Sequence, residues 1–315
     1  ALMSARQVVA LGSAAVGALV ALNGALSTTT HQPKSLMPGD ARRFTWKHGS
    51  IHYTVLGNGS PLLLIHGIGV AASSYEYRYV VEPLARSHTV YALDLLGFGL
   101  SDHPKVHYTA SLYTELISDF LRNVVGQPSE VVAAGLSALP CVEVGADRPE
   151  LIRSLVLSSP SPPDGRPELP AVMRDTAEAI LSVPVLGQSI FNAMTARNAI
   201  RAYMRDRAYS NPALVTESMV DAHYAMAHQP NARLAAQAYL AGRLSTDATE
   251  ALARFRQPLL LIVGADSIPA PMQSVADYVR LAPQTQVRVL ERCGILPHEE
   301  QAEHFSRKVI DWLQT

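Results

Sequence analysis

The sequence predicts an α/β fold built on a mostly parallel, doubly wound sheet that carries a helical insertion. Short apolar runs rich in β-branched residues alternate with longer stretches of helical periodicity, and one long internal segment is helical in pattern without a convincing strand. With 315 residues, 48% hydrophobic and 17% charged, the chain can bury the core of one large domain. This composition excludes a disordered or collagen-like polymer.

The expected strands are apolar runs bounded by turn residues. Helical periodicity between them is clearest over residues 113–125 and 272–281. Ligands of doubly wound sheets bind at the carboxyl ends of the strands, so residues that follow a strand are the first candidates for chemistry. The strands are expected at residues 51–55, 61–65, 89–93, 131–134, 154–158, 258–263 and 287–290.

The domain organisation follows from where this alternation starts and where it breaks. Residues 27–43 are polar and contain Pro33 and Pro38, which predicts a linker. The main domain is expected over residues 44–315, and its segment 161–256, rich in Ala, Met, Tyr and Arg, is expected to form a helical cap over the sheet. Arg197 and Arg201 in that segment indicate either a solvated cap helix or a basic helix that sits on anionic lipid headgroups.

Residues 1–26 form an apolar N-terminal segment. Its nineteen residues 8–26 carry no charge and follow Arg6, which is close to the length that a helix needs to cross a hydrocarbon core of about 30 Å. One interpretation is a single-pass transmembrane helix with the side of the main domain left open. A stripe of small residues on one face would let a helix of a membrane-protein partner approach closely: Ser13, Gly17, Ala21 and Ala25.

The alternative for the same segment is a secretory signal peptide. Ala25-Leu26-Ser27 resembles a small-residue cleavage site, and Arg6 supplies a short positive region before the apolar run. Cleavage would release a secreted or periplasmic protein. Both interpretations remain open from the sequence.

Charge and cysteine usage limit the partners. The chain has 26 basic and 27 acidic side chains, a formal net charge of −1, so nothing indicates a nucleic-acid partner. Two cysteines, Cys141 and Cys293, are too few for a disulfide framework and lack the spacing of a zinc site. The histidines are scattered, so we expect no metal and no cofactor.

Four segments, each of which follows a predicted strand, carry a resemblance to a known family. They are His-Gly-Ile-Gly at 66–69, Asp-Leu-Leu-Gly-Phe-Gly at 94–99, Gly-Leu-Ser-Ala-Leu at 135–139, and Gly-Ala-Asp-Ser at 264–267. The last strand then runs into Gly-Ile-Leu-Pro-His-Glu-Glu at 294–300. From about Phe44 to the C-terminus the chain thus resembles the capped, esterase- or lipase-like members of the α/β-hydrolase superfamily. The resemblance implies the α/β-hydrolase fold.

The resemblance also implies site roles. Ser137 takes the place of the nucleophile at a sharp strand-to-helix turn, where the serine backbone is expected to be strained, although Leu139 stands where a second glycine is usual. Asp266 takes the place of the acid, and the backbone N–H groups of Ile68 and Ala138 those of the oxyanion donors.

Two departures affect the chemistry. Ile295 stands at the position of the catalytic histidine, and an isoleucine can neither accept nor return the serine proton. Asp266 comes one residue before the expected acid position, which Ser267 holds. His298, three residues after Ile295, is the candidate substitute base.

Two functions therefore stand side by side. The first is an esterase- or lipase-like hydrolase of an apolar carboxylic ester or lipid-like ligand, with an incomplete triad. The second is a pseudoenzyme, a catalytically inactive membrane-anchored binding or structural subunit of a membrane-protein complex. Neither needs a cofactor.

Overall fold

The structure, a computed structural model, describes residues 36–166, 170–267 and 272–314. The N-terminal segment 1–26, interpreted above as an anchor or a signal, lies outside the described residues. Among the described residues, no helix is both long enough and apolar enough to cross a membrane.

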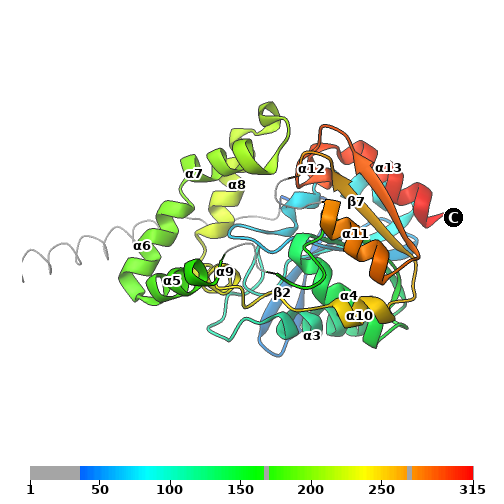
Figure 1. The fold of residues 1–315 in the computed structure, drawn as a ribbon, viewed down its shortest axis with the longest axis horizontal. Coiled ribbons are helices and arrows are strands. Elements are labelled where there is room, and N and C mark those ends of the chain that lie inside the picture. The colour runs from blue at the N-terminus through cyan, green and yellow to red at the C-terminus, as the bar shows by residue number, and fades with distance from the viewer. Residues whose placement is uncertain (1–35, 167–169, 268–271, 315) are drawn as a thin grey trace, which may run out of the picture.

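An eight-stranded sheet forms the centre of the larger lobe (Figure 1). Its strand order is β1-β2-β4-β3-β5-β6-β7-β8. β1 and β2 pair antiparallel, β2 joins β4 antiparallel, and every later pairing is parallel. The predicted mostly parallel sheet is confirmed, and each of the seven expected strands is present. The strands are β1 (Asp40–Trp46), β2 (Gly49–Leu56), β3 (Ser60–Ile65), β4 (His88–Leu93), β5 (Ser129–Ala134), β6 (Ile152–Ser158), β7 (Leu259–Gly264) and β8 (Thr285–Leu290).

The eighth strand, β1, was not expected. It begins at Asp40, inside the segment 27–43 that the sequence predicts as a linker. β1 is an edge strand whose first four residues are exposed, so it lacks the apolar run by which the other strands are recognised. The linker prediction is therefore wrong from residue 40 onward.

Helices cover both faces of the sheet, as a doubly wound fold requires. Side chains of α3, α4, α10 and α11 pack with Leu63 and Ile65 in one core, and those of α2 and α13 pack with Leu62 and Leu64 in the other. Alternate residues of β3 thus face opposite cores. These helices are α2 (Val81–Ala85), α3 (Ala110–Phe120), α4 (Ala138–Asp147), α10 (Thr249–Arg254), α11 (Met272–Leu281) and α13 (Ala302–Leu313).

The cap separates β6 from β7 and forms its own lobe beside the sheet (Figure 1). Between those strands, the residues that the structure describes contain helices and turns and no strand. An apolar cluster that includes Met204, Tyr209 and Met219 joins this lobe to the loop after β8. The cap helices are α5 (Ala171–Ser182), α6 (Pro184–Met194), α7 (Arg197–Tyr203), α8 (Glu217–Ala227) and α9 (Arg233–Leu240).

Candidate active site

The turn between β5 and α4 determines which residue lies at the centre of the carboxyl edge of the sheet. β5 ends at Ala134, which pairs with Ser158 of β6, and a 3-10 turn over Gly135–Ser137 leads into α4. Gly135 adopts φ +51°, in the left-handed region, while Ser137 has the ordinary helical values φ −65° and ψ −12°. The strained backbone expected at the serine therefore lies at Gly135, two residues earlier.

Ser137 is buried, and its hydroxyl is engaged. Its Oγ donates to the backbone carbonyl of His66 at 2.6 Å. The backbone N–H of Ala138 donates within the turn, to the carbonyls of Gly135 and Leu136. The two groups that the sequence assigned to nucleophile and oxyanion donor thus form hydrogen bonds that build the turn itself.

The loop after β3 is fixed by its own histidine and by a buried acid. The N–H of Leu95 donates to His66 Nε2 at 3.0 Å, so the proton resides on Nδ1, which lies 2.7 Å from the carbonyl of Gly67. The N–H of Gly67 in turn donates to Glu76 Oε1 at 2.9 Å. Ile68 follows in this loop and is buried.

His298 is buried beside Ser158 and Glu76. Its Nδ1 is 2.8 Å from Ser158 Oγ, its Nε2 is 3.2 Å from Glu76 Oε1, and its ring packs against Tyr77 with a centroid distance of 4.6 Å. Burial raises the pKa of Glu76, but the hydrogen bond and charge of His298, together with the Gly67 N–H, outweigh it and lower that pKa overall. His298 therefore contacts Glu76, which supports the His-Gly loop at residues 66–69. Ser137 instead bonds to the backbone carbonyl of His66.

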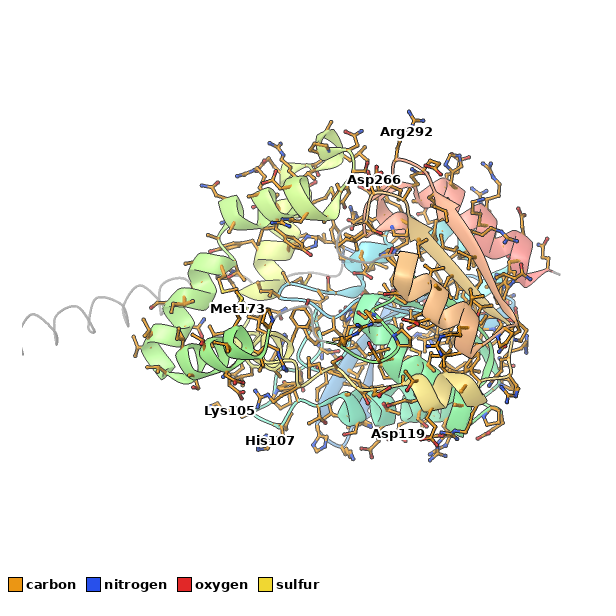
Figure 2. The ribbon with its side chains drawn as sticks, viewed as in Figure 1. Lys105, His107, Asp119, Met173, Asp266 and Arg292 are labelled. Carbon is orange, nitrogen blue, oxygen red and sulfur yellow. The ribbon has the colours of Figure 1, made fainter. Side chains whose placement is uncertain are left out.

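The loops that carry the acid and base positions meet the cap, where Figure 2 labels Asp266. Asp266 is exposed, and its Oδ2 accepts a hydrogen bond from Ser210 Oγ of the cap at 2.5 Å. Ile295 is half-buried against the apolar cap cluster, and its N–H donates to the carbonyl of Ala208 at 3.0 Å. Ser267 Oγ bonds to the carbonyl of Gly264 at 2.8 Å.

Glu300 belongs to the segment 294–300 that carries the family resemblance, but no role is predicted for it from the sequence. Its carboxylate accepts from the backbone N–H groups of Ser210 at 3.1 Å and Asn211 at 2.8 Å in the cap, and of Gly294 at 2.7 Å in the core. Its cap partners are backbone amides 90 and 89 residues away along the chain, so no local pattern could predict these contacts. Glu300 fastens the cap to the loop after β8.

Replacing Glu300 by Gln is expected to loosen this attachment. Hydrogen bonds to a charged acceptor contribute about 1.5–3 kcal/mol each, and the neutral amide has one acceptor oxygen in place of two. Hydrogen exchange of the Ser210, Asn211 and Gly294 amides should therefore speed up. Glu303→Gln, at a site whose side chain is 88% exposed, is the matched control. Equal exchange rates in the two variants would contradict the role given to Glu300.

A second buried pair of a histidine and a carboxylate lies beside β4. Asp94 Oδ2 is 2.9 Å from His52 Nδ1 and accepts from the N–H of Leu100 at 2.9 Å, while its Oδ1 accepts from that of Ser74 at 2.7 Å. Burial raises the pKa of Asp94, but the hydrogen bond from His52, together with the charge of His52 and the Leu100 N–H, lowers it overall. Over the part of the chain that the structure describes, no three His, Cys, Asp or Glu side chains converge to hold a metal ion.

Comparison with known proteins agrees with this architecture. Residues 62–306 match the model of the alpha/beta hydrolase family. The chain is 24% identical over 273 residues to 2-hydroxy-6-oxo-6-(2'-aminophenyl)hexa-2,4-dienoic acid hydrolase of Metapseudomonas resinovorans, covering 83% of this chain and 86% of that protein. It is 27% identical to 2-(acetamidomethylene)succinate hydrolase of Mesorhizobium japonicum, over 84% of this chain and 92% of that protein.

The solved structure of a serine hydrolase involved in carbazole degradation superposes with a TM-score of 0.70 at 21% identity, over 87% of this chain and 98% of that one. This likeness shows a shared fold. Neither of the two relatives is named as a lipase or an esterase. Since the family model spans most of the described residues, the chain belongs to the alpha/beta hydrolase family.

Proposed function

We propose that this domain is a catalytically silent alpha/beta hydrolase whose role is binding or structural. One observation carries the proposal: the residue at the left-handed apex between β5 and α4 is Gly135. In this fold the nucleophile sits on that strained strand-to-helix turn, with its side chain exposed at the top of the sheet. A glycine at the apex presents no hydroxyl to a substrate.

The remaining candidate groups support the same proposal. The Ser137 hydroxyl donates a hydrogen bond to a backbone carbonyl, and a serine without an imidazole beside it is a poor nucleophile. His298 is bound by Ser158 and Glu76, and Asp266 by Ser210. Removal of one triad nucleophile or base costs about 10⁶-fold in a well-studied protease, and the candidate residues that the structure describes form no triad.

What the domain retains favours binding. The His-Gly loop is held by hydrogen bonds on both sides, and the cap is fastened over the carboxyl edge by Glu300 and Ser210. A site that is covered and ordered but lacks a nucleophile can hold a ligand without turning it over. The two relatives act on carboxylic acids by their names, so a small carboxylate is the first ligand class to test.

Reaction with a fluorophosphonate tests the proposal, because this reagent forms a covalent adduct with an activated serine. Intact-mass spectrometry of the wild-type chain should show no adduct, and hydrolysis of short-chain p-nitrophenyl esters should not exceed that of Ser137→Ala. An active serine hydrolase treated in parallel shows that the reagent is competent. An adduct at Ser137 that Ser137→Ala abolishes, or one at Ser158, would overturn the silent assignment.

A further inference from the structure

The cap presents an apolar face on α5 and α6. Half of the twelve large hydrophobic side chains exposed on the described residues lie within this one helical pair. Scattered exposed hydrophobics are normal on a soluble surface, but a gathering of them marks a site of interaction. The α5–α6 face consists of Val172, Met173, Ile180, Val183, Leu186 and Met194, which are 38–76% exposed.

The sequence of this face is also without charge over most of its length. Residues 179–196, which include all of α6, contain no Asp, Glu, Lys or Arg. A helix that borders water normally carries charged residues on its outer face. α6 instead exposes Leu186 and Met194, eight residues apart on the same side of the helix. The outer surface of α6 is thus suited to an apolar environment.

The place where the described chain begins points to one occupant for this face. Leu36 and Met37 line a small cavity together with Met226 of α8, so the described chain starts against the cap. Only nine residues, 27–35, separate this point from the uncharged segment 8–26. Fully extended, they span about 30 Å, so a membrane that held residues 8–26 would lie within that distance of the cap.

We propose that the α5–α6 face rests in the interface of a lipid bilayer that residues 8–26 enter. Helices of this kind bury their apolar side about 5–10 Å into the boundary between headgroups and acyl chains. Two of the neighbouring arginines contribute little attraction to anionic lipid, because Arg197 pairs with Asp221 and Arg201 with Glu217, each at 2.5 Å. Apolar contact therefore carries the docking, and salt should not release it.

A fluorophore that senses lipid tests the docking. The full chain is labelled with nitrobenzoxadiazole at Met173→Cys or Leu186→Cys, with Glu303→Cys on α13 as the matched control, and mixed with phosphatidylcholine vesicles. Cys141 and Cys293 are both buried and stay unlabelled. We expect brominated phosphatidylcholine to quench the label at positions 173 and 186, equally at low and high salt, and to spare the label at 303.

The competing occupants give different results. If a second copy or a soluble protein covered the face, brominated lipid would not quench positions 173 and 186, and the proposal would be overturned. Equal quenching at 303 would overturn it too, as would failure of the chain to bind vesicles. Leu186→Asp in the Met173→Cys chain should reduce the quenching while circular dichroism stays unchanged. This test is independent of hydrolytic activity.

Discussion

A chain that carries Gly135→Ser together with Ile295→His is expected to react with a fluorophosphonate at position 135, where the wild type does not react. A side chain fits at that apex, because a Cβ on Gly135 would meet only the Cα of Gly67, at 3.9 Å. The left-handed backbone of a serine at this position is expected to destabilise the fold by about 1–3 kcal/mol. A positioned general base should make the double variant react about 10²–10⁴-fold faster than Gly135→Ser alone.

The control for this prediction is Ser137→Ala in the double-variant background. Its labelling rate should equal that of the double variant, because Ser137 lies in the turn with its hydroxyl bonded to His66. Peptide mapping identifies the labelled residue. An adduct on Ser137 would show that the nucleophile position is 137 and not 135.

Replacing Glu76 by Gln is expected to destabilise the fold by about 1.5–3 kcal/mol at neutral pH, the range for hydrogen bonds to a charged group. Glu76 is buried and its carboxylate supports both the Gly67 N–H and His298. Urea unfolding measures the loss. Glu303→Gln, on the exposed side of α13, should change the unfolding free energy by less than about 1 kcal/mol.

The variant Glu76→Gln should also change how the unfolding free energy depends on pH in the acid range. The pKa of Glu76 is lower in the folded chain than its usual 4.5, so the ionised carboxylate stabilises the fold above about pH 4.5 and loses this contribution as pH falls through the folded value. Wild type and Glu76→Gln should therefore converge in stability at low pH. The slope that remains in the variant comes in part from Asp94, whose pKa is also lowered. A constant difference down to the acid transition would contradict this role.

The strands were predictable because burial on both faces leaves a local pattern. β3 reads Ser-Pro-Leu-Leu-Leu-Ile, and its four leucine and isoleucine residues are completely buried. β1 was missed because pairing with β2, rather than burial, makes it a strand, and backbone pairing leaves no mark in side-chain composition.

The site was harder to predict because its register depends on where β5 ends. The segment Gly135-Leu136-Ser137 fits two registers equally well, because small alanines flank it on both sides. In the first register Ser137 is at the apex and Gly135 precedes it by two residues. In the second register Gly135 itself is at the apex. The pairing of Ala134 with Ser158 places the turn at the next residue and decides for the second. The sequence singled out the segment that holds His298 and Glu300, but their partners Ser158 and Asn211 lie far away along the chain, so no local pattern could predict these contacts.

The charged edge strand β1 also bears on how copies of this protein meet. An open sheet edge offers unpaired N–H and C=O groups to a neighbouring chain, and charged side chains along it discourage that pairing. Asp40, Arg42 and Arg43 are exposed on β1, and Arg288 is exposed on β8 at the opposite edge. Edge-to-edge pairing of two copies through their sheets is thus discouraged at both edges.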